Sequence, residues 1–309
     1  MTLNIDSILF PTDFSDVAEG AFAHAAHLAV QYDATIHVFN VVSPDEAPDT
    51  NPMDFLPVTP PEEGAGPSDA AVQHMEVQTA TQERGTVPVI YSQMDSASPS
   101  EAIIDYAAER DVDVVVMGTH GRQGMDRLLS GSVSEEVVRG APCPVFTVLP
   151  SEEESGIPTI SRVLAPVDLS EQSSMVVNHA AALSDAYGAP LDLLHVVEEA
   201  AYPSAYGLDA TSTNQPNVQN RAREALETLA GELEMRPDPV HIHVLAGNAA
   251  RDIVEFADEH EADLIVMATH GRTGLERFLI GSVAEKVVRR APCPVFTLKS
   301  FGKSLLPEA

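Results

Sequence analysis

Two stretches of this chain repeat each other: VVVMGTHGRQGMDRLLSGSVSEEVVRGAPCPVF at Val114–Phe146 and IVMATHGRTGLERFLIGSVAEKVVRRAPCPVF at Ile265–Phe296. Between Met117–Val148 and Met267–Leu298, 22 of 32 residues are identical. Each stretch begins with an apolar run, continues with spaced glycines and ends in a charged segment of helical periodicity. Because the copies lie 150 residues apart, they indicate a duplicated domain rather than a solenoid, whose repeats are about 20–50 residues long.

The rest of the sequence repeats in the same order. SILFPTD at 7–13 matches RVLAPVD at 162–168, and IHVFNVV at 36–42 matches LDLLHVV at 191–197. Each copy therefore alternates short apolar runs with helical patterns.

A length of 309 residues suits two domains of ordinary size. We expect one domain at 1–150, a polar linker at 151–157 and a second domain at 158–300. In the first copy the patterns predict helices near 16–34, 70–84, 99–110 and 132–139, strands near 7–13, 35–42, 87–91, 112–118 and 144–149, and a long loop at 43–69.

The predicted strands VDVVVMG at 112–118 and ADLIVMA at 262–268 are apolar at consecutive positions. A strand with this pattern is buried on both faces, as in a parallel sheet covered by helices. The sequence therefore predicts two α/β domains built on parallel sheets.

The composition is strongly acidic, with 47 acidic residues, 17 basic residues and a formal net charge of -30. A surface of this kind repels nucleic acid and anionic membranes. With only three lysines among its bases it resembles the proteins of salt-accumulating halophiles, and an acidic protein of an ordinary organism is the alternative. No apolar run reaches the length of about 18 residues needed for a membrane span, and the first residues lack the pattern of a secretory signal, so we expect a cytoplasmic protein.

Two residue pairs suggest metal or redox chemistry, although simpler roles suit them as well. Cys143 and Cys293 stand between prolines at matching positions, and they could be a redox pair, metal ligands or two reduced thiols at the starts of buried strands. We expect reduced thiols. His241 and His243 have a spacing that can hold zinc, but the sequence offers no third ligand near them.

The glycine motif between the strand and the helix has the strongest chemical implication. Gly118 and Gly121 are followed, after nine residues, by Gly131-Ser132. A helix that begins after such a loop directs free N–H groups and a partial positive charge at its ligand, which favours phosphate. The pattern lacks the lysine of a P-loop and differs from the dinucleotide fingerprint, so by itself it leaves phosphate binding open. Ser132 with Glu135, and Ser282 with Glu285, have the spacing of capping boxes.

PTDFS at 11–15, GTHGRQG at 118–124, SGSVSEEVVRGAPCPV at 130–145 and the tandem arrangement together resemble the universal stress proteins. The resemblance implies two five-stranded parallel domains with strand order 3-2-1-4-5. In this order strands 1 and 4 are neighbours at the point where the order reverses, which is where open sheets bind ligands. Pro11–Asp13 and Gly118–Gly121 would then border one crevice.

Family members with this glycine signature bind ATP or a related adenine nucleotide, and the resemblance implies the same here. Asp13 and the backbone of Val41 would lie at the adenine, and the glycine loop would lie along the ribose and phosphates, with Mg²⁺ or Mn²⁺ able to accompany the phosphates. The implied ligand residues of the first copy are Pro11, Thr12, Asp13, Val41, Gly118, His120, Gly121, Arg122, Gly131, Ser132, Val133 and Ser134. Those of the second are Pro166, Val167, Asp168, Val196, Ala268, His270, Gly271, Arg272, Gly281, Ser282 and Val283.

Several of these residue types could serve a structural role instead of a chemical one. Asp13 and Asp168 could be catalytic bases or helix caps. The loop histidines could transfer protons or bind metal, or they could simply be held by backbone contacts. The loop arginines could contact phosphate or pair with the many carboxylates; they are Arg122, Arg127, Arg272 and Arg277.

The two copies differ at positions that bear on ligand binding. Ala268 replaces Gly118, and Ala284 replaces Ser134. If Gly118 had left-handed geometry, Ala268 would cost roughly 1 kcal/mol in that conformation. We expect both sites to form, the first being the stronger.

The resemblance predicts a nucleotide-dependent stress-response regulator or sensor with at most slow hydrolysis, and not an enzyme. An interaction module that binds no nucleotide is the alternative. A nucleotidyl transferase is disfavoured because HIGH-like and SGGxDS-like motifs are absent. Family members pair through their last strands, so we predict an internal pseudo-dimer through PVFTVL and PVFTLK; two chains could associate further, and any protein partner is unknown.

Overall fold

The computed structural model describes residues 2–42, 72–78, 84–119, 133–149, 159–198, 215–233, 236–269, 280–299 and 302–307. The chain divides into two units. The N-terminal unit comprises Asn4–Thr159 together with Gly302–Pro307, and the C-terminal unit comprises Ile160–Phe301 together with Met1–Leu3. No helix within the described ranges is both long enough and apolar enough to cross a membrane.

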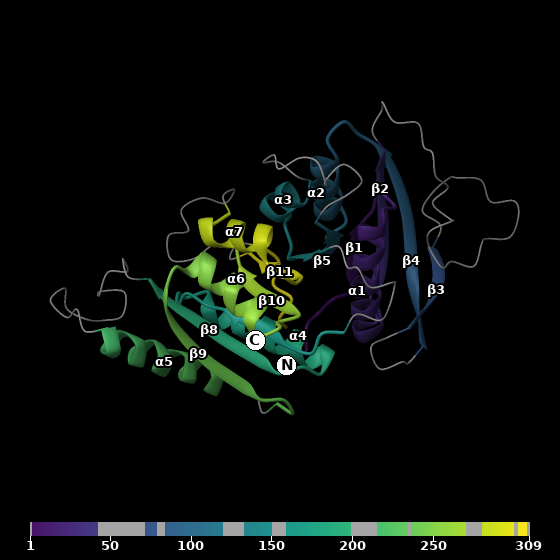
Figure 1. The fold of residues 1–309 in the computed structure, drawn as a ribbon. Coiled ribbons are helices and arrows are strands. Elements are labelled where there is room, and N and C mark those ends of the chain that lie inside the picture. Colours follow the sequence, from purple (N-terminus) through teal and green to yellow (C-terminus); the bar gives the residue numbers. More distant parts are fainter. Residues whose placement is uncertain are drawn as a thin grey trace, which may run out of the picture. The chain divides into compact units, whose positions relative to one another are not determined.

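The N-terminal unit is a sheet flanked by helices, with strand order β3-β4-β2-β1-β5-β6 (Figure 1). β1, β2, β4, β5 and β6 are parallel and have the predicted order 3-2-1-4-5, whereas β3 is antiparallel to β4. Its elements are β1 (Ser7–Pro11), α1 (Asp16–Tyr32), β2 (Thr35–Val42), β3 (Val72–Gln78), β4 (Arg84–Asp95), α2 (Pro99–Glu109), β5 (Val114–Gly118), α3 (Val133–Gly140) and β6 (Val145–Val148).

The C-terminal unit has the strand order β9-β8-β7-β10-β11, which is again 3-2-1-4-5, and all of its strand pairs are parallel. Its elements are β7 (Val163–Pro166), α4 (Ser173–Tyr187), β8 (Leu191–Glu198), α5 (Gln215–Gly231), β9 (Val240–Gly247), α6 (Ala249–Glu259), β10 (Leu264–Ala268), α7 (Ser282–Arg290) and β11 (Val295–Leu298).

The two copies differ between their second and third parallel strands. We predicted a helix near 70–84, and this prediction is wrong: the segment contains β3, and β4 is longer than the predicted strand at 87–91. The C-terminal unit has α5 in the corresponding connection, where it packs on β8 and β9. In the N-terminal unit, backbone pairing with the edge of β4 overrides the local helical preference.

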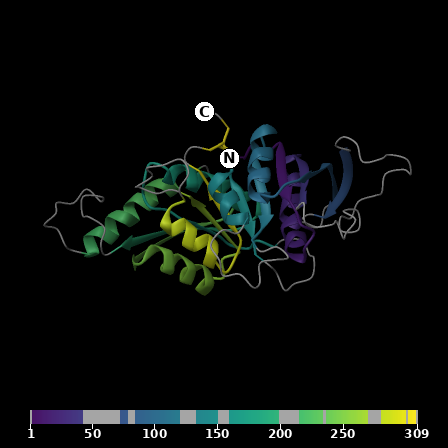
Figure 2. The ribbon, with the colours of Figure 1, turned by 90° about the horizontal axis from the view of Figure 1, so that it is seen from above.

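The central strands are buried as their apolar runs predict. The first four residues of β5 and of β10 are all buried. In the C-terminal unit α6 and α7 pack on each other, side by side in Figure 2, while α4 packs on α5. Right-handed crossovers that run in opposite directions along the sheet place these two helix pairs on opposite faces.

Two carboxylates at matching positions fix the starts of the first strands. Asp113 Oδ2 accepts hydrogen bonds from the N–H groups of Asp6 and Ser7, both at 2.8 Å. Asp263 Oδ2 accepts from the N–H of Ser161, also at 2.8 Å. Each bond ties the beginning of β1 or β7 to the loop before β5 or β10, and so fixes the two strands whose far ends form the candidate site.

The last described segment, Gly302–Pro307, packs into the N-terminal unit. The Leu305 side chain is fully buried, and the Leu305 carbonyl accepts from the Asn4 N–H at 2.6 Å. Lys303 Nζ lies 2.8 Å from Asp113 Oδ1 and 3.0 Å from Asp111 Oδ2. This C-terminal segment therefore belongs to the structure of the first domain, although the sequence places it after the second.

Both cysteines are buried thiols outside any disulfide, as predicted. Burial, followed by the negative charge of Asp263, raises the pKa of Cys293 to about 12. The thiol is therefore protonated at neutral pH.

Candidate functional site

The candidate sites lie at the carboxyl ends of the strands where the strand order reverses. β1 has β2 on one side and β5 on the other, and β7 lies in the same way between β8 and β10. In open α/β sheets, ligands bind outside the carboxyl ends of the strands at such a point. The loops after β1 and β7 border this place, whereas most of the loops after β5 and β10 lies outside the described residues.

The loop after β1 is held by a dense set of hydrogen bonds. The Thr12 N–H donates to the Phe39 carbonyl at 2.9 Å, and Thr12 Oγ1 accepts from the Phe14 N–H at 3.0 Å. Asp13 Oδ1 accepts from the Ser15 N–H and the Ser15 hydroxyl at 3.1 and 2.6 Å. Asp13 itself is exposed, so this network presents a fixed carboxylate at the edge of the sheet.

The turn from this loop into α1 uses a left-handed residue. Phe14 has φ 57, and the Ser15 hydroxyl caps α1 by accepting from the Ala18 N–H. Asp13 therefore stabilises the turn but is not itself the helix cap.

The loop after β7 has the same design. The Val167 N–H donates to the Leu194 carbonyl at 2.9 Å, Asp168 Oδ1 accepts from the Ser170 N–H at 3.0 Å, and Leu169 has φ 59. The Ser170 Oγ atom is buried and finds no hydrogen-bond partner among the described residues. The second loop thus places an unsatisfied hydroxyl beside its carboxylate.

Val41 and Val196 lie where β2 extends past the end of β1 and β8 extends past the end of β7. The Phe39 carbonyl faces β1, where it accepts from the Thr12 N–H, and the Val42 carbonyl faces the other way and accepts from the Ser96 N–H. Because strand residues alternate, the N–H and carbonyl of Val41 face the β1 side, beyond Pro11 where β1 ends. A neighbouring molecule could pair with this side of β2.

Gly118 and Ala268 both end a strand. The N–H of the next residue, Thr119 or Thr269, donates to the last strand of its unit, to the Val148 or Leu298 carbonyl. Gly118 does not have positive φ; among the described glycines only Gly188 does. The left-handed geometry that would have penalised Ala268 is therefore absent, and this replacement costs no backbone strain.

The start of α7 differs from the predicted capping box. The helix begins at Ser282, and its N-cap is Gly281, whose carbonyl accepts from the Glu285 N–H at 2.9 Å. The Glu285 carboxylate contacts Arg289. Ser282 is therefore inside the first turn of α7 and is not its cap. The Gly281 N–H donates to the Thr269 carbonyl at 2.7 Å, which fixes the residue directly before the helix. The corresponding cap at Ser132 lies outside the described residues.

Ser134 has a structural partner. Its hydroxyl donates to the Thr119 carbonyl at 3.0 Å, and the residue is buried. The predicted contact of this hydroxyl with phosphate would have to replace that bond. In the C-terminal unit Ala284 has no hydroxyl, and the Thr269 carbonyl accepts from the Gly281 N–H at 2.7 Å, which links the loop to the helix there.

Other predicted ligand residues lie outside the described part of the chain, and their roles stay predictions. They are His120, Gly121, Arg122, Gly131, Ser132, His270, Gly271 and Arg272.

Sequence reasoning missed two residues behind the loops. The Asn40 side-chain amide donates to the Thr12 carbonyl, and His195 Nδ1 donates to the Val167 carbonyl, each at 2.8 Å. Both side chains are buried. A signal was available, since each is a polar residue at the same position of a largely apolar strand.

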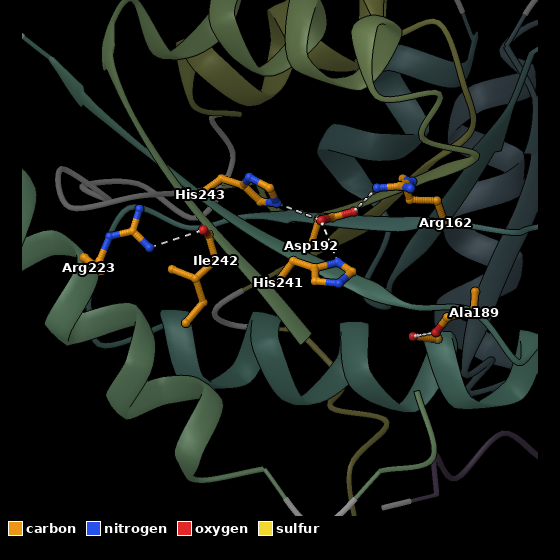
Figure 3. Close-up of polar contacts among 8 residues, drawn as sticks. Arg162, Ala189, Asp192, Arg223, His241, Ile242 and His243 are labelled. Carbon is orange, nitrogen blue, oxygen red and sulfur yellow. Dashed lines mark hydrogen bonds and ion pairs between the residues drawn. The ribbon is translucent and has the colours of Figure 1, made fainter. Parts of the chain in front are cut away.

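His241 and His243 belong to a polar cluster away from the candidate site (Figure 3). His243 Nε2 lies 2.7 Å and His241 Nδ1 3.3 Å from Asp192 Oδ1, and Arg162 Nη1 lies 3.1 Å from Asp192 Oδ2. Asp192 and His241 pair near the starts of β8 and β9, so the cluster is at the opposite end of the strands. Within the described ranges, no group of three or more His, Cys, Asp or Glu side chains could hold a metal ion.

The comparisons with known proteins agree with this fold. The universal stress protein family model matches residues 4–148 and 159–299. A universal stress protein of Methanocaldococcus jannaschii is 32% identical over 158 residues, which cover 51% of this chain and 93% of that one. A universal stress protein of Mycobacterium tuberculosis (strain ATCC 25618 / H37Rv) is 31% identical over 212 residues, covering 68% of this chain and 69% of its own.

A solved structure shares the fold along almost the whole chain. The crystal structure of a universal stress protein from Archaeoglobus fulgidus matches with a TM-score of 0.60 and 18% identity, covering 96% of this chain and 97% of that one. The family model matches both copies of the duplicated domain. The chain belongs to the universal stress protein family.

Proposed function

We propose that this protein binds an adenine nucleotide, ATP foremost, in the crevice beside Asp13 and at the matching place beside Asp168. We further propose that occupancy of these sites regulates the protein as a stress-response regulator or sensor. The observation that carries the proposal is the matched pair of loops, each of which fixes a carboxylate beside a strand that extends past it.

The polar groups suit a purine on the β2 side. The N–H and carbonyl of Val41 offer one donor and one acceptor side by side, and the edge of adenine offers the complementary pair. A carboxylate only accepts hydrogen bonds, so Asp13 suits an amino or hydroxyl group and would repel a phosphate. The adenosine end is therefore assigned to the loop after β1, with the phosphates directed away from it.

The helix N-termini suit the phosphates. α3 and α7 each follow the glycine loop, and a helix N-terminus carries free N–H groups and roughly half a positive charge. In the C-terminal unit the Gly281 N–H donates to the Thr269 carbonyl. We propose that the first site is the stronger, because Ser134 offers a hydroxyl where the second copy has Ala284.

A divalent ion is part of the proposal. Mg²⁺ usually keeps several water ligands and binds through phosphate oxygens rather than through a protein cage. The ion would neutralise phosphate charge near a protein whose own net charge is -30. No protein side chain is assigned to it.

Isothermal titration with ATP and Mg²⁺ tests the proposal. We expect two sites in the native protein and one site after Asp13→Asn or Asp168→Asn. Asp33→Asn is the matched control, because Asp33 is exposed, lies at the end of α1 and has the left-handed geometry that asparagine tolerates. No binding at millimolar ATP by the native protein would refute the proposal.

A second candidate function applies to the C-terminal unit alone. The engaged Gly281 N–H and the position of Ser282 inside α7 favour a unit that binds no nucleotide and serves as an interaction module. One titration site, lost with Asp13→Asn and retained with Asp168→Asn, would support this alternative.

The proposal describes a binding protein rather than an enzyme. Incubation of the protein with ATP for hours, followed by chromatography of the nucleotides, tests this point. Multiple turnovers per minute would contradict it.

A further inference from the structure

We infer that Asn40 and His195 are positioning residues that hold the carboxylate loops in the geometry the ligand needs. The inference rests on the proposed function. Asn40 on β2 donates to the Thr12 carbonyl and His195 on β8 donates to the Val167 carbonyl, both at 2.8 Å. The two residues hold matching positions in the two copies.

The contact is retained although the surrounding residues differ. TIHVFNVV at 35–42 and PLDLLHVV at 190–197 are identical only in their two final valines. At the position before those valines, an amide in one copy and an imidazole in the other donate to equivalent backbone carbonyls, those of Thr12 and Val167. Both copies therefore have a hydrogen-bond donor at this position, although the residue type differs.

This hydrogen bond links the two sides of the proposed purine slot. The N–H of Thr12 is already bonded to β2 through the Phe39 carbonyl, so both backbone polar groups of Thr12 are fixed on that strand. Thr12 precedes Asp13, and Asn40 precedes Val41. The hydrogen bond from Asn40 to Thr12 thus fixes the distance between Asp13 and Val41, both of which would contact the ligand.

Val167 and His195 make the same link in the C-terminal unit. The Val167 N–H donates to the Leu194 carbonyl, and its carbonyl accepts from His195. Asp168 and Val196 follow these residues directly. The equivalence of the two links argues for a role at the site, because each unit could have packed an apolar side chain at this buried position.

The donor assignments follow from the partners. A carbonyl only accepts, so the proton must be on His195 Nδ1, whether the ring is neutral or charged. Asn40 Oδ1 accepts from Gln93 Nε2 at 3.3 Å, which leaves its amino group facing Thr12. The two side chains are therefore expected to be interchangeable, whereas a residue of similar size without a donor is not.

The test compares such variants at one site at a time, with the other carboxylate removed. In Asp168→Asn protein, Asn40→Asp and Asn40→Leu remove the donor, and Asn40→His supplies the donor found in the other copy. In Asp13→Asn protein, His195→Phe and His195→Asn form the same comparison. We expect the donor-free variants to raise the Kd for ATP about tenfold or more, and the exchange variants to stay within about threefold.

A second readout separates positioning from general destabilisation. Inorganic triphosphate has no purine or ribose, so its binding at the helix N-terminus should change less than that of ATP. Urea unfolding in parallel establishes that each variant is folded, and Asn40→Leu serves where Asn40→Asp fails to fold.

The outcomes distinguish the inference from the proposed function. If ATP affinity is unchanged in all donor-free variants, or if ATP and triphosphate affinities fall equally, the inference is wrong and the proposed function stands. If the native protein binds no ATP, the proposed function is wrong and the inference falls with it.

Discussion

Buried histidines at matching positions make the stability of each unit depend on pH. His24 on α1 lies against Phe146, with ring centroids 5.0 Å apart. Burial, followed by the nearby His27, lowers the pKa of His24 from 6.5 to about 4. Burial also lowers the pKa of His179, the equivalent residue on α4, although the hydrogen bond to the Met175 carbonyl opposes this. The folded state therefore favours the uncharged form of each ring.

The unfolding free energy should fall as pH is lowered from about 6.5 towards 4. In that range the unfolded chain binds a proton at His24 more readily than the folded protein does, so protonation favours unfolding. A shift from 6.5 to about 4 corresponds to about 3 kcal/mol. Urea titrations at several pH values should show that His24→Leu reduces this loss and that a double variant with His179→Leu reduces it further. Parallel curves for native and variant proteins would contradict the prediction.

At the residue scale the sequence points to the loop carboxylates but not to the residues that support their loops. The PTD and PVD motifs single out Asp13 and Asp168, because each motif is a continuous stretch of the chain, and their contact with a ligand stays a prediction. Asn40 and His195 contact their loops across 28 residues, so only the folded backbone reveals their partners. The predicted cap of α7 is wrong by one residue. The hydrogen bond from Gly281 to Thr269, which accompanies the earlier helix start, joins residues that are also far apart in the sequence.

At the element scale the parallel strands were predictable and the edge strand was not. The apolar runs of β5 and β10 match the burial of those strands, because both faces of a central strand meet helices. β3 forms by pairing with β4, and its own sequence does not predict that pairing. The connection between the second and third parallel strands contains α5 in the other copy, so the parallel core is compatible with either element.

Two glycines at different places in the elements should respond oppositely to alanine. A Cβ on Gly20, within α1, would meet nothing within 4 Å, so Gly20→Ala should raise the unfolding free energy by about 1 kcal/mol through helix propensity. A Cβ on Gly247 would lie 2.0 Å from Asp252 Oδ2, which accepts from the Asn248 N–H at the start of α6. Gly247→Ala should therefore cost about 1–3 kcal/mol. Urea unfolding of both variants measures the contrast, and equal effects would show that local space is not decisive.

The C-terminal segment should stabilise the N-terminal unit through Lys303. Burial alone would raise the pKa of Asp113, but the Lys303 contact and the N–H groups of Asp6 and Ser7 outweigh burial and lower it. Lys303→Met leaves this buried carboxylate without its cation, and we expect a loss of about 1–3 kcal/mol at neutral pH.

The same contact gives a pH signature. Because the pKa of Asp113 is lowered in the folded state, its contribution is present above the usual carboxyl pKa and is lost as the pH falls below it. Urea unfolding of Lys303→Met and of the control Lys303→Arg should therefore differ at pH 7 and converge in acid. A difference that is independent of pH would assign the effect to packing of the segment instead.

At the scale of the whole molecule, charge and duplication have separate consequences. The net charge of -30 is spread over both copies, so no single ion pair or element can offset it. Pairing of the two copies through β6 and β11, and association of two chains, stay predictions. Size measurement in solution tests both, and two freely tumbling halves would contradict the first.

Salt should stabilise this protein over a wide range of concentration. The screening length falls from about 10 Å at 0.1 M to about 3 Å at 1 M, so KCl should suppress repulsion between neighbouring carboxylates. If about five such pairs are relieved at a few tenths of a kcal/mol each, the unfolding free energy rises by about 2 kcal/mol. Thermal and urea unfolding from 0.1 to 2 M KCl measure the rise. Sucrose at equal osmolality separates charge screening from the general exclusion of solutes from the protein surface.

A variant with fewer surface charges tests the cause. It replaces four exposed acids of α2 and α6 by amides, and it should be more stable at low salt and gain less from KCl; the changes are Asp105→Asn, Glu109→Gln, Asp258→Asn and Glu259→Gln. If the native protein and this variant gain equally, repulsion among surface carboxylates is not what limits its stability.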